Sequence, residues 1–358
     1  MTPPLKGRGA QSNRASRYLA VSADTAPEFV DAVPDPEADV PRHPATTIRI
    51  ETPRTVISHN DSPDVPFTSS INPYRGCEHG CIYCYARPSH AYLDLSPGLD
   101  FETQIYAKPN AAELLDSELR RPGYRPEVIH LGANTDPYQP AERELRITRR
   151  ILEKLLEFGH PVTVLTKGAL IERDLDVLGE LARRGLARVA MSVTTLDNDL
   201  KRTLEPRAAS PAARLRALAA LAGAGIPTAV MVAPVIPAVN DHELEAILEA
   251  AAAAGVKRAG WILLRLPREV RDLVEEWLAA HRPLAAARVM SLVRETRGGR
   301  DNDPRFHARM RGEGAYAELI GRRFDAAVRR FGFEPEAPAP LAASQFRVPP
   351  AGGQLALF

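Results

Sequence analysis

The sequence predicts an α/β fold, a partial TIM-like (β/α)6 barrel with disordered N- and C-terminal extensions and a helical C-terminal segment. Two observations support this prediction. From about residue 66 to residue 282, short runs rich in β-branched residues alternate with longer amphipathic runs. The short runs are apolar on both faces, as in strands of a parallel sheet that is covered on both sides. Because six such units are fewer than the eight of a closed barrel, we expect a barrel that is open on one side.

The two ends of the chain differ in composition from the middle. Residues 1–58 are rich in Pro, Ala, Asp and Arg and show little helical or strand periodicity, and residues 334–358 have the same character. Such segments bury too little apolar surface to offset the entropy of ordering them. We therefore expect a disordered N-terminal extension over 1–58 and a disordered tail over 334–358.

The middle of the chain contains the predicted strands and helices. A short extended segment, TSSINPYRG (68–76), precedes the first helical region. Segments such as ERELRITRRILEKLLEFG and SPAARLRALAALAGAG have apolar residues at spacings of three and four and end in Gly, as helices often do. The other predicted strands are VIHLGA (128–133), VTVLTK (162–167), RVAMSVT (188–194), TAVMVAPVIP (228–237) and AGWILLRLP (259–267).

Composition narrows the class of protein. The formal net charge is +1, so no field of the whole molecule argues for a nucleic-acid or membrane partner. There is no apolar run of the length that spans a bilayer, and the first residues lack the apolar core of a secretory signal. We therefore predict a cytoplasmic protein without membrane contact, in which cysteines stay as thiols or thiolates.

All three cysteines of the chain lie within eight positions. Cys77, Cys81 and Cys84 form the pattern C-x3-C-x2-C on a glycine-containing loop. Three thiolates this close favour an iron-sulfur cluster, and a cluster of four irons would keep one iron without a protein ligand. The alternative is a zinc site with His79 or His90 as its fourth ligand, although structural zinc sites usually have two separated ligand pairs and the second pair is missing here.

This cysteine pattern, with Tyr83 just before the last cysteine, resembles the signature of the radical S-adenosylmethionine (SAM) superfamily. Further motifs are similar to the branch related to spore photoproduct lyase, and the resemblance covers about residues 60–300. These motifs are GCEHGCIYCYARPSH, GANTDPYQPAE, VLTKG, SVTTLD and EPRAASP.

The resemblance implies a partial barrel, here over residues 59–282, that binds a 4Fe-4S cluster and SAM. In that superfamily the reduced cluster cleaves SAM to methionine and a 5'-deoxyadenosyl radical, which abstracts a hydrogen atom from the substrate. An electron donor such as flavodoxin or ferredoxin is the implied partner. The substrate, the fate of SAM and the oligomeric state are not predicted.

Site residues follow from the resemblance one motif at a time. Tyr83 would lie near the adenine of SAM, Thr135 would meet its amino or carboxylate end, and Lys167 its carboxylate. Ser192 matches the ribose-binding position, and Arg207 would be a second anchor for the carboxylate. Simple packing of Tyr83 and a solvated Lys167 remain the alternatives.

One departure from spore photoproduct lyase affects the chemistry. That enzyme has a further cysteine that donates a hydrogen atom to the product radical, whereas Ala133 stands at the corresponding position here. Tyr85 is then the best candidate for a catalytic radical relay or a substrate contact. An aromatic residue packed beside the cluster is the equal alternative.

The C-terminal segment, 283–333, is basic. From residue 282 to residue 332 there are twelve arginines against six acidic residues. Such density suits phosphate contact and base stacking, which makes a nucleic acid the candidate substrate. A solvated helix and a lid over the barrel are the alternatives. Two functions are thus predicted: a radical SAM enzyme that is lyase-like or performs another radical modification, and a zinc-stapled nucleic-acid-binding protein without catalysis.

Overall fold

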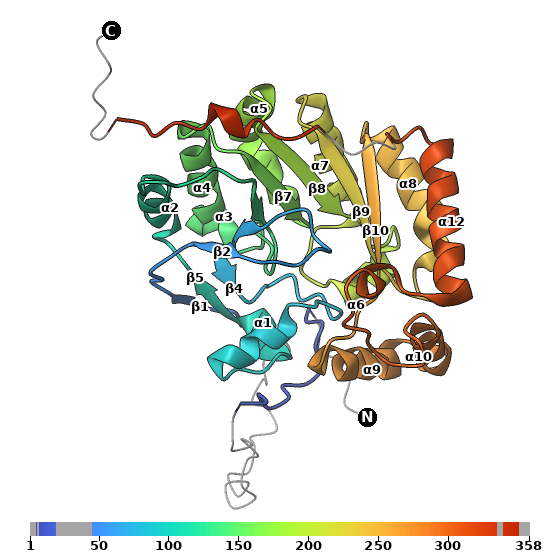
Figure 1. Cartoon of the computed structure of the whole chain (residues 1–358). Coiled ribbons are helices and arrows are strands. Elements are labelled where there is room, and N and C mark those ends of the chain that lie inside the picture. The colour runs from blue at the N-terminus through green and yellow to red at the C-terminus, as the bar shows by residue number, and fades with distance from the viewer. Residues whose placement is uncertain (1–4, 6, 19–44, 335–338, 351–358) are drawn as a thin grey trace, which may run out of the picture.

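A computed structural model describes residues 5, 7–18, 45–334 and 339–350. Its main sheet has seven strands in the order β10-β9-β8-β7-β6-β3-β2 (Figure 1). Six of these strands are parallel, and β2 pairs antiparallel with β3 at one edge. The strands are β2 (Ile57–His59), β3 (Ser69–Ile71), β6 (Ile129–Leu131), β7 (Val162–Thr166), β8 (Ala187–Ser192), β9 (Thr228–Val235) and β10 (Arg258–Leu263). The predicted six-stranded partial barrel is confirmed.

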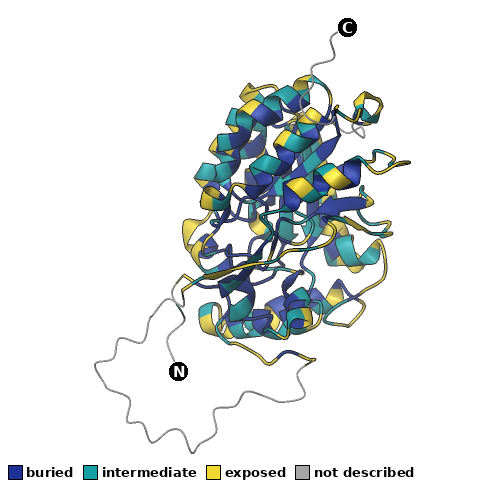
Figure 2. Cartoon of the chain, turned by 90° about the vertical axis from the view of Figure 1, so that its left-hand side faces the viewer, coloured by how far each residue is buried: buried dark blue, intermediate teal, exposed yellow. Residues whose placement is uncertain are grey.

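Helices connect the strands and cover the outer face of the sheet. Figure 2 shows that they turn their exposed residues to the outside and their buried residues to the sheet. The last helix, α12, packs on α8 and on β10, so it covers the edge of the barrel. The helices are α1 (Leu99–Thr103), α2 (Ala111–Leu119), α3 (Glu142–Leu145), α4 (Ile147–Glu157), α5 (Leu175–Arg183), α6 (Asn198–Leu204), α7 (Pro211–Gly223), α8 (Leu244–Ala253), α9 (Glu269–His281), α10 (Ala286–Glu295), α11 (Ala308–Arg311) and α12 (Gly314–Arg330). The predicted helical C-terminal segment is therefore confirmed.

Local sequence explains where these helices begin and end. At α7 the Ser210 side chain accepts a hydrogen bond from the Ala213 backbone N–H, and Pro211 occupies the first turn, where its missing N–H costs nothing. Gly225, with φ of 74°, follows the helix and turns the chain toward β9.

Alternation along the strands separates the outer core from the lumen. On β7, Val162 and Val164 are buried in the main apolar core. Thr163 lies on the opposite face, and its hydroxyl is 2.9 Å from Nδ1 of His130 on β6. The helix-facing side of the sheet is thus apolar, and the lumen carries polar groups.

A second, small sheet lies beside the barrel. It has the order β1-β5-β4, with β1 (Thr47–Ile50) parallel to β5 (Gln104–Ala107) and β4 (Tyr74–Arg75) antiparallel to it. Because β4 leads directly into the cysteine-containing segment, this sheet fixes where that segment begins.

The prediction of a disordered N-terminal extension over 1–58 is wrong for residues 7–18 and 45–58. The Gly9 and Ala10 backbone N–H groups donate to the buried Glu102 carboxylate over 3.0 and 2.8 Å. A Cβ on Gly9 would lie 1.9 Å from the Gly80 carbonyl oxygen, so only glycine allows this approach. Backbone hydrogen bonds rather than an apolar face order this segment, which explains why it lacks periodicity. Residues 19–44 lie outside the described residues.

The prediction of a disordered tail over 334–358 is wrong for residues 339–350. The Ala342 N–H donates to the Gly185 carbonyl over 3.1 Å, and the Arg347 N–H donates to the Phe158 carbonyl over 3.0 Å. Phe346 stacks on Phe158 at a centroid distance of 6.1 Å. Since Phe158 and Gly185 precede β7 and β8, the tail crosses the amino ends of the strands. Residues 335–338 and 351–358 lie outside the described residues.

None of the helices in the described part of the chain combines the length and the apolar character that crossing a bilayer requires.

Candidate active site

The cysteine loop, residues 76–86, lies at the carboxyl ends of the parallel strands. Cys77 accepts a hydrogen bond from the backbone N–H of Asp136, which follows β6, and the charge of Lys167, which follows β7, acts on Cys81. The loop turns at Gly76 and Gly80, whose φ angles are 75° and 67°. These left-handed conformations favour glycine. The loop therefore sits where barrel folds carry their active sites.

A buried ion pair between Arg87 and Glu102 holds the cysteine loop in place. Arg87 donates to the Cys81 carbonyl oxygen over 2.8 Å and to the Glu102 carboxylate over 2.5 Å. Both side chains of this pair are fully buried. Because Glu102 also accepts the N–H groups of Gly9 and Ala10, the N-terminal segment and the cysteine loop share one anchor. Removing either charge would release both.

The three thiols are free and lie close to one another. Cys77 and Cys81 are buried, and Cys84 is half-buried. Burial raises the pKa of Cys77 well above its ordinary value, and the charges of Asp136 and Cys81 add to the increase. Burial also raises the pKa of Cys81, to about 12, although Lys167 opposes this increase. Buried thiols of this kind stay protonated near neutral pH unless a cation stabilises the thiolate.

Tyr83 is held by a buried polar network beneath the loop. Its hydroxyl donates to Glu205 and lies 3.2 Å from the Thr194 hydroxyl. Glu205 is paired with the buried Arg214, which also donates to the Ser192 carbonyl over 2.9 Å. Burial disfavours the charge of Glu205, but Arg214 and Lys167 outweigh it and lower its pKa to about 2. The Tyr83 ring is thus fixed in one orientation.

Lys167 presents an ammonium group that no described carboxylate pairs with. Its Nζ lies 5.8 Å from the centroid of the Tyr83 ring. Burial disfavours the charged form, yet Cys81 and Glu205 raise the pKa of Lys167 above its ordinary value. The Ser192 hydroxyl likewise has no hydrogen-bond partner among the described side chains, although the residue is 4% exposed. Both groups are available to a ligand.

Thr135 and Arg207 are engaged in other contacts. The Thr135 hydroxyl donates to the Tyr74 carbonyl oxygen over 3.0 Å. Arg207 donates to the Glu78 carboxylate over 3.0 Å, and its backbone N–H bonds the His79 carbonyl oxygen. The Thr135 oxygen can still accept a hydrogen bond, and Arg207 would have to share its charge with Glu78.

Asp136 organises the loop after β6. Its carboxylate accepts from the Thr166 hydroxyl over 2.6 Å and from the Lys167 backbone N–H over 2.7 Å, and it lies 3.3 Å from Nδ1 of His79. Burial opposes its charge, but His79 lowers the pKa of Asp136 to about 2. The loops after β6 and β7 are therefore tied to the cysteine loop.

Tyr85 lies at the open side of the cysteine loop. It is 49% exposed, and its hydroxyl donates to the Ala133 carbonyl oxygen. The Arg265 guanidinium lies over its ring, 5.7 Å from the centroid. Tyr85 is therefore fixed at the barrel mouth and not packed into the core.

Each candidate zinc ligand has one ring nitrogen engaged, and the buried Nδ1 of His90 has no hydrogen-bond partner among the described residues. His79 is bonded to Asp136, and His90 places Nε2 3.1 Å from the Gln104 carbonyl oxygen, at the far side of the loop. Across the residues that the structure describes, no three His, Cys, Asp or Glu side chains meet at a point that suits a single metal ion.

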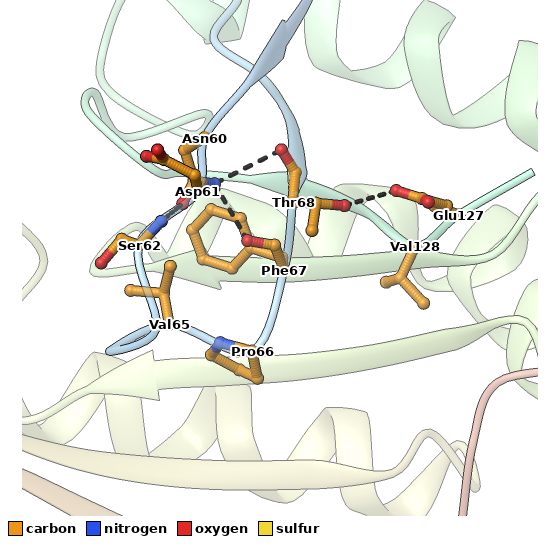
Figure 3. Close-up of a pocket in the computed structure, with 9 residues that line it drawn as sticks. All are labelled: Asn60, Asp61, Ser62, Val65, Pro66, Phe67, Thr68, Glu127 and Val128. Atoms are coloured by element: carbon orange, nitrogen blue, oxygen red, sulfur yellow. Dashed lines mark hydrogen bonds between the residues drawn. The ribbon is translucent and has the colours of Figure 1, made fainter.

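A separate pocket lies away from this constellation. It has a volume of about 320 Å³ and is enclosed mainly by the segment before β3 and the residues before β6 (Figure 3). The Phe67 ring stacks on His130 at a centroid distance of 4.1 Å. None of the predicted site residues contributes to it. Its lining residues are Asn60, Asp61, Ser62, Val65, Pro66, Phe67, Thr68, Glu127 and Val128.

The structure therefore brings several predicted residues together, namely the three cysteines, Tyr83, Tyr85 and Lys167. Ser192 joins them through Arg214. Sequence reasoning missed Glu205, although it stands in the same EPR turn as Arg207, and it missed Asp136, although it stands beside Thr135. A charged residue inside an otherwise matched motif was the signal for both.

Comparisons with known proteins agree with this geometry. The family model of the radical SAM superfamily matches residues 71–251. An uncharacterized protein of Mycobacterium tuberculosis is 42% identical over 232 residues, which are 64% of this chain and 68% of that protein. An uncharacterized protein of Methanocaldococcus jannaschii is 28% identical over 173 residues, 48% of this chain and 62% of that protein.

Solved structures resemble the chain in fold. Spore photoproduct lyase in complex with a dinucleoside spore photoproduct matches with a TM-score of 0.58 and 16% identity, over 80% of this chain and 81% of that one. A mutant of the same enzyme matches with a TM-score of 0.57. The predicted likeness to this branch is thus confirmed for the fold.

Proposed function

The chain belongs to the radical SAM superfamily of enzymes, and we propose on this premise that Cys77, Cys81 and Cys84 hold a 4Fe-4S cluster at which SAM binds. The observation that carries the proposal is the set of three unpaired thiols on one loop at the carboxyl ends of the strands. When bound, the cluster and SAM supply a 5'-deoxyadenosyl radical that abstracts a hydrogen atom from a substrate. The substrate would be a nucleic acid.

The donor set of this chain fits such a cluster. Three thiolates would satisfy three of the four irons and leave the fourth without a cysteine. The backbone N–H of Asp136 donates to Cys77, and hydrogen bonds to thiolates stabilise their charge. Lys167 adds a positive charge near Cys81. These contacts would lower the cost of holding several thiolates in a buried loop.

The SAM contacts follow from which groups are unengaged. We assign the SAM carboxylate to Lys167, whose ammonium has no ion-pair partner among the described residues, with Arg207 as the second anchor. Ser192 would donate its hydroxyl to the ribose, and the Thr135 oxygen would accept from the SAM amino group. Tyr83, fixed by Glu205, would offer its ring to the adenine.

Tyr85 is the proposed catalytic residue. Its phenol lies at the barrel mouth and donates to the carbonyl oxygen of Ala133. Ala133 is the residue that the sequence comparison matched to the donor cysteine of spore photoproduct lyase. Because no thiol besides the three loop cysteines occurs in the chain, a phenolic O–H is the donor that remains near the cluster. An electron donor such as flavodoxin or ferredoxin would reduce the cluster, in a reducing compartment such as the cytoplasm.

The zinc-stapled alternative is not favoured. Its fourth ligand would be His79 or His90, but among the described residues no three His, Cys, Asp or Glu side chains form a site for a single metal ion.

The test is anaerobic reconstitution followed by incubation with SAM and dithionite. Wild type should bind about four irons and four sulfides per chain and form 5'-deoxyadenosine. Cys81→Ala and the near-isosteric Cys81→Ser should lose both, because neither retains a thiolate, while circular dichroism checks that they fold. Formation of 5'-deoxyadenosine by either variant, or a colourless wild type with one zinc, would show that the proposal is wrong.

A further inference from the structure

Arg265 is a guanidinium at the barrel mouth that forms no ion pair with the described carboxylates. It follows β10, and the backbone N–H of Leu264 before it bonds the Val235 carbonyl oxygen, so Arg265 leaves the sheet at its carboxyl end. Its charge lies over the Tyr85 ring, 5.7 Å from the centroid. Arg265 therefore lies at the same end of the sheet as Lys167, and both charges act on Tyr85.

The contacts of Arg265 do not balance its charge. Among the described residues no carboxylate lies within ion-pair distance, and its buried Nε has no hydrogen-bond acceptor. Its Nη1 meets only the sulfur of Met310, at 3.7 Å, which is a weak acceptor. Burial and the neighbouring Arg309 both lower the pKa of Arg265 below its ordinary value. An arginine in this position costs free energy in the free protein.

Two fully buried arginines have an acid as partner, whereas the buried Arg297 donates to backbone carbonyl oxygens among the described residues. Arg87 pairs with Glu102, and Arg214 pairs with Glu205. Next to Arg265, the charge of Arg309 is neutralised by Asp64, whose carboxylate is 1% exposed. Arg309 thus has an acid as its ion-pair partner, whereas Arg265 has no carboxylate within ion-pair distance among the described residues and feels Asp64 only as a more distant charge. An unbalanced guanidinium at the mouth of an active site indicates an anionic group of the ligand.

Two exposed aromatic rings flank these guanidinium groups. Tyr85 lies under Arg265, and Phe306, which is 51% exposed, lies under Arg309 at 4.7 Å from its centroid. Exposed rings next to arginines are how proteins stack bases while they hold the phosphates between them. The segment that carries Phe306 and Arg309 has twice as many arginines as acids. A polymer of phosphates fits this surface better than a single carboxylate.

We propose that Arg265 binds a backbone phosphate of a nucleic-acid substrate, with the Tyr85 and Phe306 rings as stacking surfaces for the adjoining bases. The inference rests on the proposed function, because it takes the cysteine loop as the catalytic centre. A guanidinium can hold two phosphate oxygens at once, so the contact would set how far the target nucleotide reaches toward the cluster.

The test measures binding of a fluorescein-labelled single-stranded oligonucleotide to the reconstituted protein by anisotropy. Arg265→Gln should weaken binding about tenfold, or about 1.4 kcal/mol, and reduce the salt dependence by about one counterion. The affinity of Arg265→Lys should lie between those of wild type and Arg265→Gln, since lysine keeps the charge but cannot bind two phosphate oxygens at once as a guanidinium does. Arg300→Gln removes an exposed arginine of the same segment and is the matched control, expected within about twofold of wild type.

Several outcomes would overturn the inference: no oligonucleotide binding by wild type, equal losses in Arg265→Gln and Arg300→Gln, or an acidic peptide that binds as tightly and is equally sensitive to Arg265→Gln. A loss of SAM affinity in Arg265→Gln with unchanged oligonucleotide binding would also overturn it, because Arg265 would then serve SAM. Failure of the proposed function is separate: wild type would form no 5'-deoxyadenosine while the binding assay still reports on Arg265.

Discussion

Glu205→Gln should destabilise the protein strongly, because it removes one charge of a buried ion pair and keeps its shape. The Glu205 carboxylate is 0% exposed and the Arg214 guanidinium 1% exposed. Glu205 also accepts the hydroxyls of Tyr83 and, over 2.7 Å, of Thr194. In the variant the Arg214 charge stays buried without compensation.

Two arguments give the magnitude. Breaking a buried ion pair by removing one partner costs about 3–5 kcal/mol. Independently, the pKa of Glu205 falls from 4.5 to about 2 in the folded protein, and at about 1.4 kcal/mol per pH unit this is about 3 kcal/mol. The folded pKa is depressed, so this stability is fully present above about pH 4.5 and is lost as the pH falls toward 2.

The assay is urea unfolding of wild type and variant at pH 7 and at intervals down to pH 3. Glu205→Gln should lower the unfolding free energy by about 3–5 kcal/mol at pH 7, and the difference should shrink toward pH 3. Glu245→Gln is the matched control, since its pair with Arg323 is partly exposed, and it should cost less than about 1 kcal/mol. A loss below about 1 kcal/mol for Glu205→Gln, or a difference that grows as the pH falls, would refute the reasoning.

Three further predictions test the site and the fold. Lys167→Met should weaken SAM binding by about tenfold or more in equilibrium dialysis, whereas Lys257→Met, at an exposed position, should not. Equal SAM affinities of wild type and Lys167→Met would show that Lys167 does not bind SAM. Gly132→Ala should lower the free energy of unfolding in urea by at least about 3 kcal/mol, because Gly132 has φ of 102° and a Cβ would lie 2.2 Å from the Leu165 carbonyl oxygen. Gly123→Ala is the control: Gly123 has φ of 80° and open space around it, so this variant should lose about 1 kcal/mol. Similar losses in the two variants would contradict the close packing at Gly132. Phe346→Ala should lower stability by about 1–3 kcal/mol, since the ring stacks on Phe158, while the exposed Val348→Ala should change little; no difference between them would argue against the docked tail.

The fold was predictable where apolar periodicity governs the chain. Runs such as the one over β7 bury alternate valines against the helices, and that pattern is visible in the sequence. The docking of the N-terminal segment was not predictable, because Gly9 and Ala10 are held by backbone hydrogen bonds to a carboxylate far along the chain. Amino-acid composition indicates how much apolar surface a segment can bury, but it does not show which backbone groups form hydrogen bonds.

The candidate site divides in the same way. The cysteines were predicted from their spacing on one short loop, and Lys167 from its place in the motif VLTKG, which resembles the spore photoproduct lyase branch. The pairs Glu205–Arg214 and Asp136–His79 did not follow, since a pair depends on which two loops meet in space. Arg265 was not predictable either, because only the structure shows that its buried Nε has no hydrogen-bond acceptor among the described residues.

The proposed site depends on three thiolates that would leave one iron open to SAM. The most direct measurement is electron paramagnetic resonance of the dithionite-reduced protein before and after SAM is added. The cluster signal should change its shape when SAM is added, because SAM would become a ligand of the iron that no cysteine holds. A cluster signal that SAM leaves unchanged in wild type would contradict the proposed site.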